Sequence, residues 1–125
     1  MQRDMELVRE ILLEIHNRKG LKQKLVQLDG YEQEIIDRHV EMLFRAGLID
    51  GVPIKTLDRP VAQVLVSDLS WDGHDFLAAL RDKGVWAKIK STLTAADLAM
   101  MPLQVLKDVG IALLKKSLME KLDSL

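Results

Sequence analysis

The segment AGLIDGVPIKTLDRPVAQVLVSDLS, residues 46–70, gives the clearest indication of how this chain folds. It follows a segment with helical spacing of apolar residues and changes to extended character. Two apolar runs, Ile49–Leu57 and Val61–Val66, are separated by Asp58-Arg59-Pro60, which are residue types that form turns. The stretch therefore predicts an antiparallel β-hairpin. Pro53 places the first strand at an edge of the sheet or shortens it, because proline cannot donate a backbone hydrogen bond.

Apolar residues at helical spacing predict helices on both sides of this hairpin, over about residues 4–18, 32–46, 71–82 and 103–122. Asp4 is a suitable N-cap for the first helix, and Gly20 suits the left-handed position after its end. Gly47 ends the second helix, and Ser70 caps the third. The apolar stripes predict one shared core cluster that contains Leu12, Ile36, Val40, Leu43, Phe76 and Leu80.

Residues 21–29, LKQKLVQLD, fit two structures equally well. The leucine spacing suits a short helix, whereas residues 25–28 also suit a strand. A helix would place Val26 before a turn at Gly30 and Ile36 on the following helix, which is the geometry of a helix-turn-helix.

The order helix, short element, helix, hairpin and helix is that of a winged-helix domain, with the hairpin as the wing. The predicted fold is mainly α with a small β-hairpin. It comprises a winged helix-turn-helix domain over residues 1–90, a linker-like segment over 91–102 and a C-terminal amphipathic helix over 103–125.

Composition narrows the classes of function. The chain has 125 residues, with 18 basic and 19 acidic side chains and a formal charge of −1, which argues against a protein that mainly coats nucleic acid. It has no cysteine, so disulfides, thiolate metal sites and cysteine nucleophiles are excluded. The sequence shows neither a signal peptide nor a long apolar run, so we expect a soluble cytoplasmic protein without a membrane partner.

Charge is unevenly distributed around the expected recognition helix. Residues 29–50 carry six acidic and two basic side chains, whereas HNRKGLKQK, residues 16–24, carries four basic and no acidic ones. Phosphates repel carboxylates and attract cations. We therefore expect contacts with the backbone of duplex DNA from Arg18, Lys19, Lys22 and Lys24, helped by Arg38, Lys55 and Arg59. The alternative is that these lysines are a solvated loop and that the acidic helix, with Asp37 and Glu41 on its solvent face, binds a basic protein partner.

The three histidines do not form a metal-binding pattern. His16, His39 and His74 lack a second ligand at the spacing of one helical turn, and a zinc site needs three or four convergent ligands. We expect no metal and no cofactor, and we interpret His39 as a histidine at the edge of the core that is hydrogen-bonded to the backbone.

The segment LSWDGHDFL, residues 69–77, contains a serine, a histidine and two aspartates, the residue types of a catalytic triad. Ser70 and His74 lie one turn apart at the start of a helix, where helix capping explains them, and no nucleophile turn is present. We therefore expect no catalytic residue and a protein that is not an enzyme. Trp71 and Phe76 are expected in the core, because stacking surfaces for nucleic acid usually combine aromatic with basic residues.

The last helix has an apolar face that is too wide for a helix lying half-exposed on a small domain. It packs either on its own core, with the first helix as one candidate, or against the same helix of a second chain. We expect the homodimer, because Gly110 permits close approach of a second backbone and Pro102 with the preceding TAADLAMM run lets the helix swing outward. The residues expected at the dimer contact are Leu106, Val109, Leu113, Leu114, Leu118 and Leu122.

Three segments together carry a family resemblance: RDMELVREILLEI at 3–15, GYEQEIIDRHVEMLFRAGLI at 30–49, and LSWDGHDFLAALRDKGVWAKIK at 69–90. They resemble the bacterial and phage proteins of domain-of-unknown-function family 2513, which show a Gly-Tyr plus His-x-x-x-Leu pattern and a Leu-Thr-Trp-x-Gly-His-x-Phe-Leu signature. This chain departs from the pattern at Ser70, where threonine is usual, and at Glu32, where a serine cap is common. The resemblance implies a winged-helix fold, an extended segment over 21–29 and frequent occurrence in prophages, but no catalytic residues.

Overall fold

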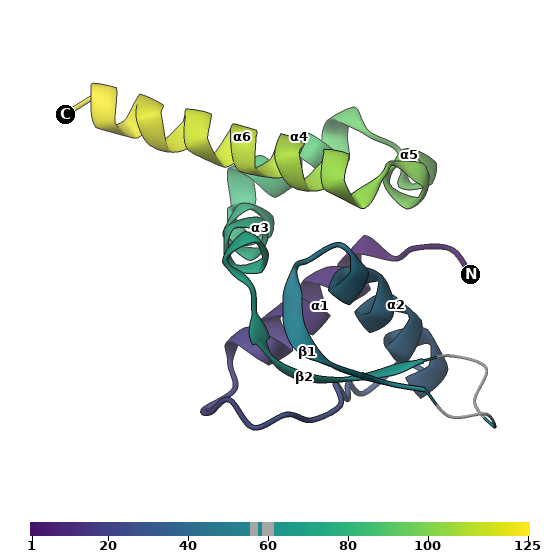
Figure 1. Cartoon of the computed structure of the whole chain (residues 1–125). Helices are drawn as coiled ribbons and strands as arrows, with labels where there is room; N and C mark the ends of the chain where they lie inside the picture. Colours follow the sequence, from purple (N-terminus) through teal and green to yellow (C-terminus); the bar gives the residue numbers. More distant parts are fainter. Residues whose placement is uncertain (56–57, 59–61) are drawn as a thin grey trace.

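The structure is a computed structural model that describes residues 1–55, 58 and 62–125. Within these residues the protein is mainly helical, with a small antiparallel hairpin and a long C-terminal helix, as the sequence predicts (Figure 1). The elements in chain order are α1 Met5–His16, α2 Gln33–Arg45, β1 Ile49–Ile54, β2 Gln63–Leu69, α3 Trp71–Arg81, α4 Lys83–Thr92, α5 Ala95–Met100 and α6 Leu103–Asp123.

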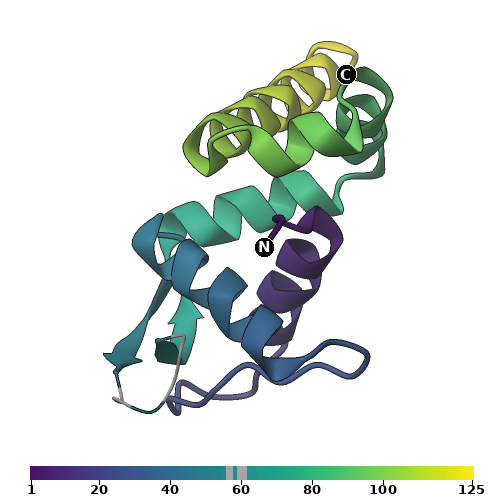
Figure 2. The same ribbon diagram turned by 90° about the vertical axis from the view of Figure 1, so that its right-hand side faces the viewer.

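The elements form two layers that are joined by α3. Figures 1 and 2 show α1, α2 and the hairpin on one side of α3, and α4, α5 and α6 on the other. Helix α3 contacts α1 and β2 in the first layer and α4 and α6 in the second. The predicted core is confirmed, because one buried cluster contains Leu12, Ile36, Val40, Leu43, Phe76 and Leu80.

The predicted hairpin is confirmed in the residues that the structure describes. Strand β1 pairs antiparallel with β2, with Ile49 opposite Leu69, and β2 runs three residues beyond its predicted end at Val66. The predicted ends of the runs at residues 57 and 61 lie outside the described residues. On its other side β2 exchanges backbone hydrogen bonds of 3.1 and 2.9 Å with Lys24, through Val66. Strand β1 is therefore an edge strand, as the presence of Pro53 predicts.

Residues 21–29 do not form the short helix that their leucine spacing allowed. The placement of Val26 on the first helix of a helix-turn-helix is therefore wrong. The bridge between Lys24 and Val66 makes the segment extended, as the family resemblance implies. Arg18 fixes this conformation, because its guanidinium donates to the carbonyl oxygens of Val66 at 2.5 Å and of Lys24 and Leu25 at 3.4 Å. Tertiary hydrogen bonds thus override a local helical preference.

The helix ends agree with most of the predicted caps. The Asp4 carboxylate accepts from the backbone of the first turn of α1, and Gly47 adopts a left-handed φ of 75° directly after the C-cap of α2. Ser70 caps α3 by accepting from Gly73 N–H at 3.0 Å. The prediction for Gly20 is wrong, because α1 already ends at His16 and Gly20 has no left-handed φ.

The segment expected to be a linker, residues 91–102, is largely helical. Helix α4 extends to Thr92, and α5 begins with a capping box in which Thr94 and Asp97 exchange side-chain to backbone hydrogen bonds. The guanidinium of Arg3 donates to the carbonyl oxygens of Leu98 and Met101, which ties α5 to the start of the chain. These hydrogen bonds hold the beginning of α6 close to the rest of the protein.

Candidate interaction surfaces

Arg18, the first residue of the predicted DNA contact, is buried. Its side chain is 4% exposed and lies 3.1 Å from the Glu14 carboxylate in an ion pair one helical turn back. Because its guanidinium also donates to three backbone carbonyls, it stabilises the loop after α1. A phosphate could reach this group only if those hydrogen bonds were broken.

The remaining basic residues of the predicted contact lie in separate places. Lys19, Lys22 and Lys24 are exposed in the segment after α1, and in the described part of the chain none of them forms an ion pair. Lys24 borders β2 on one side, whereas Lys55 continues β1 on the other. Arg59 lies outside the described residues. Only the three lysines after α1 therefore form a local basic group.

The exposed face of α2 carries two ion pairs between side chains of the same helix. Arg38 lies 3.7 Å from Glu34, and Arg45 lies 2.6 Å from Glu41, each pair spanning one helical turn. Both arginines of α2 are thus paired with a carboxylate on the same helix. A winged-helix protein that binds DNA would insert this face into a groove, but both arginines of α2 are already paired with carboxylates.

The sequence predicts Asp37 on the solvent face of α2, and this prediction is wrong. Its side chain is buried, and its carboxylate accepts hydrogen bonds from the amides of Gln33 at 2.9 Å and Gln63 at 3.0 Å. Gln33 also donates to the carbonyl of Val26. These bonds join α2, β2 and the extended segment, so Asp37 stabilises the fold and does not contribute to an acidic surface.

His39 confirms the interpretation of a histidine hydrogen-bonded to the backbone, although it lies fully within the core. Its Nδ1 lies 2.8 Å from the carbonyl oxygen of Ile35, and its Nε2 accepts from Asp4 N–H at 2.9 Å. A neutral imidazole with the proton on Nδ1 satisfies both contacts. His39 therefore links α2 to the N-cap of α1.

Tyr31, the only tyrosine, lies just before α2 and is half-buried against the core. A hydrogen bond with Glu10, together with burial and the negative charges of Glu10, Asp4 and Glu6, raises the pKa of Tyr31 to about 12. The protonated hydroxyl therefore connects the start of α2 to α1.

Helix α6 divides into a buried first half and an exposed second half. Leu106 is fully buried, and Gly110 faces α3, where a β-carbon at this position would lie 3.4 Å from that of Ala79. Gly110 is therefore buried against α3 of its own chain, and the expectation that it permits close approach of a second chain's backbone is wrong. From Leu118 onward every residue of the chain is exposed. Among the described residues, no helix combines the length and apolar character that a membrane span requires.

Of the residues predicted at a dimer contact, the structure gathers three beside α3. They lie along a groove of about 420 Å³ between α3 and the second half of α6, lined by Asp75, Ala78, Ile111, Leu114, Lys115, Leu118, Met119 and Leu122. Leu114 is half-buried, while Leu118 and Leu122 are 48% and 59% exposed. Leu106 belongs to the core, and Val109 and Leu113 do not line the groove.

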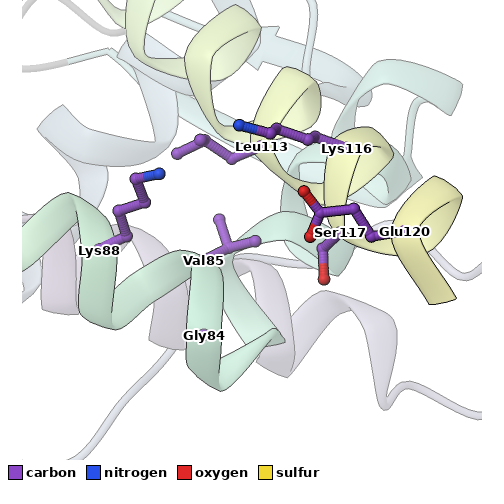
Figure 3. Close-up of a pocket in the computed structure, with 7 residues that line it drawn as sticks. All are labelled: Gly84, Val85, Lys88, Leu113, Lys116, Ser117 and Glu120. Atoms are coloured by element: carbon purple, nitrogen blue, oxygen red, sulfur yellow. The ribbon is translucent and has the colours of Figure 1, made fainter.

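A smaller hollow of about 190 Å³ lies between α4 and α6 (Figure 3). Figure 3 shows Lys88 from α4 and Lys116 from α6 on opposite sides of it, with Glu120 nearby and the apolar side chains of Val85 and Leu113 inside. Lys88, Lys116 and Glu120 are all exposed, so burial does not hold any charged group of this hollow in place.

Trp71 is on the surface, and the expectation that it belongs to the core is wrong. It is the first residue of α3 and is 86% exposed, whereas Phe76 and Leu77 of the same helix are buried. The His74 ring lies beside it with a centroid distance of 6.2 Å, and the His16 ring lies 6.1 Å from His74.

Two carboxylates lie next to this exposed indole. Asp50 on β1 is directly opposite Asp68 on β2, and both line a hollow of about 240 Å³ together with Leu69, Trp71 and His74. The Asp68 carboxylate lies 3.9 Å from His74 Nε2. Sequence reasoning missed this group, because the strand register that places the two aspartates opposite each other is not visible in the spacing of residues 50 and 68.

Comparison with known proteins places the chain in a family. The family described as "Hypothetical protein (DUF2513)" matches residues 2–99. The chain belongs to this family. The chain is also similar to a protein from Haemophilus influenzae named "Uncharacterized protein". The two are 27% identical over 120 residues, which cover 94% of this chain and 99% of the relative. The family match confirms the resemblance. It covers α1 to α4 and all but the last residue of α5, and it does not reach α6. No solved structure matches the chain.

Proposed function

We propose that the protein is a non-enzymatic interaction module of the winged-helix type that binds a protein partner and acts as a homodimer. The order of α1, an extended segment, α2 and the hairpin supports the winged-helix assignment. The paired arginines of α2 carry the preference for a protein partner. Inserting α2 into a DNA groove would separate Arg38 from Glu34 and bring the carboxylates close to phosphates.

The groove beside α6 supports the homodimer. The last turns of α6 are exposed among the residues that the structure describes, and a helix without packing is only marginally stable. The groove combines apolar side chains with one carboxylate, Asp75, and one ammonium group, Lys115. A two-fold axis brings the same patch of both subunits together, so Asp75 of one copy can face Lys115 of the other.

Sedimentation velocity of the full chain tests the dimer. We expect the wild type to sediment as a dimer and the double variant Leu118→Lys, Leu122→Lys to sediment as a monomer with unchanged helicity. Val105→Lys is the matched control, because Val105 is an exposed apolar residue of α6 outside the groove. A monomeric wild type, or a double variant that remains dimeric, contradicts the proposal.

One observation favours duplex DNA as a second candidate partner, namely the exposed lysines 19, 22 and 24 after α1. A gel-shift titration with random duplex DNA at low and moderate salt separates the two functions. For the protein-binding module we expect no salt-sensitive complex. If DNA binds, Lys22→Ala with Lys24→Ala should lower the salt slope by about two, at roughly 0.9 per lost phosphate contact. Tight binding that falls in this way would favour the DNA function.

A further inference from the structure

The segment 69–77 contains two surface residues that packing does not explain. Ser70 caps α3, and a β-carbon at position 73 would lie 1.9 Å from the Leu48 carbonyl oxygen, so the chain passes closely there only with Gly73. Phe76 and Leu77 fill the core. The side chains of Trp71 and His74 instead point to the surface, although an indole in water forgoes the stabilisation that burial would bring. Exposed tryptophans with this character commonly anchor protein interfaces.

The charges around Trp71 are unbalanced. Asp50 and Asp68 lie opposite each other across the hairpin, an arrangement of like charges that destabilises paired strands. In the part of the chain that the structure describes, no lysine or arginine lies within ion-pair distance of either carboxylate. Asp72 differs, because Lys107 pairs with it at 3.3 Å. The Asp68 carboxylate accepts from Leu69 N–H at 2.7 Å and lies 3.9 Å from His74 Nε2. Among the described residues, the two carboxylates of the hollow beside the indole therefore have no lysine or arginine partner.

Trp86, the second tryptophan, has a cationic neighbour, whereas none of the described residues supplies one to Trp71. Lys90 Nζ lies 5.7 Å from the centre of the Trp86 ring, within the range of a cation–π contact. Trp71 has two carboxylates and the imidazole of His74 beside it but no such cation from the described residues. A ligand cation would complete at Trp71 the kind of contact that the chain itself supplies at Trp86.

We propose that the corner formed by Trp71, His74, Asp50 and Asp68 binds an arginine side chain of a basic partner protein. This inference rests on the proposed protein-binding function and names the chemistry of the partner. A guanidinium stacks on the indole face and donates in-plane hydrogen bonds to carboxylates, which a lysine ammonium does less well. A nucleic-acid base could stack on Trp71, but Asp50 and Asp68 would repel its phosphates.

Fluorescence of Trp71 tests the inference. The chain has two tryptophans, so Trp86→Phe leaves Trp71 as the only indole reporter. This protein is titrated at low salt with a peptide of alternating glycine and arginine, and with the same peptide carrying citrulline in place of arginine. We expect a saturable change with the arginine peptide and none with the citrulline peptide, which has the same shape but no charge.

Two variants in the same background define the site. Asp50→Asn with Asp68→Asn should weaken binding of the arginine peptide about tenfold, as expected for the loss of two charge contacts of modest strength. Asp123→Asn removes one exposed carboxylate at the end of α6 and should leave the affinity unchanged. Circular dichroism checks that each variant keeps its helices.

Three results would overturn the inference: equal response to both peptides, undiminished binding in the double asparagine variant, or a fall in binding with Asp123→Asn as large as with that variant. Conversion of the dimer to a monomer by Trp71→Ala would also overturn it, because Trp71 would then be a contact between two copies of the chain. A monomeric wild type contradicts only the proposed dimer, since the titration does not require two subunits. Lysine-dependent DNA binding contradicts the proposed protein-binding function without changing Trp71 fluorescence.

Discussion

Helices α2 and α6 are both amphipathic in sequence, but they differ in how much of their apolar face is buried. Every apolar residue on the inner stripe of α2 is buried, and its polar face forms its own ion pairs. In α6 only the first half, with Leu103, Leu106 and Gly110, is buried, and the second half projects past α3 (Figure 1). The apolar periodicity of a helix therefore shows which side can be buried, whereas neighbouring elements determine how much of that side is covered.

The difference in burial also indicates which apolar side chains stabilise the fold and which can contact another molecule. The apolar side chains of α2 contribute to folding, and those at the end of α6 remain available to a second molecule. Variants of α2 and α6 can therefore be compared directly for stability.

The largest effect is expected from truncating a leucine of each helix. Leu43 of α2 is fully buried, so Leu43→Ala should lower the free energy of unfolding by about 2–5 kcal/mol. Leu118→Ala, in the exposed half of α6, should change the stability of the monomer by less than about 0.5 kcal/mol. Urea denaturation at a protein concentration that favours the monomer measures both, and similar losses in the two variants would refute the contrast.

The acidic residues of α2 should differ in the same way. Asp37→Ala leaves the buried amides of Gln33 and Gln63 without their acceptor and should cost about 1–3 kcal/mol. Glu34→Ala breaks only an exposed ion pair with Arg38 and should cost about 0–1 kcal/mol. Denaturation of both variants in the same buffer gives the comparison. A cost for Glu34→Ala that equals the cost for Asp37→Ala would mean that the polar face of α2 also supports the fold.

Gly110 tests how tightly the first half of α6 packs. Alanine is favoured over glycine in a helix by about 1 kcal/mol, and the new methyl group would lie 3.4 Å from the Ala79 β-carbon. We expect Gly110→Ala to stabilise the protein by somewhat less than about 1 kcal/mol, since the contact is close. Thermal unfolding measures the sign. A loss of stability would show that α6 and α3 approach too closely for a methyl group.

The smallest effect concerns the attachment of α2 to α1 through Tyr31. Its pKa of about 12 in the folded protein lies above the ordinary tyrosine value of 10.0, so the folded state holds this proton more tightly. The contribution of Tyr31 is therefore complete below pH about 10 and is lost as the pH rises toward 12. Absorbance titration of the single tyrosine should show the raised midpoint, and Glu10→Gln should lower it. A midpoint unchanged in Glu10→Gln would mean that Glu10 does not hold the hydroxyl.

The sequence predicted most elements because each depends on local chemistry. The caps at Asp4 and Ser70, the end of α2 at Gly47 and the hairpin follow from residue types and spacing over a few positions. Two errors were local, since the Gly20 cap is wrong and the capping box of Thr94 and Asp97 was overlooked. The other errors concern residues whose environment comes from distant parts of the chain. Asp37 has the sequence context of a surface residue, yet Gln63 lies beside it because β2 folds against α2.

The candidate surfaces divide in the same manner. The exposed lysines at 19, 22 and 24 and the apolar end of α6 were visible as local patterns. The register of β1 and β2, which places Asp50 opposite Asp68 next to Trp71, was not, because strand register is fixed by pairing over many residues.

Local residue patterns predicted the hairpin, the core stripes, most of the helices and caps, and the family, since backbone preferences and apolar periodicity act within a few turns. They did not predict that Arg18 holds an extended segment, that Trp71 faces water or that α6 is covered over only half its length. Burial and hydrogen bonding at these residues depend on partners far away in the chain, and a partner's position is not encoded in the residues next to it.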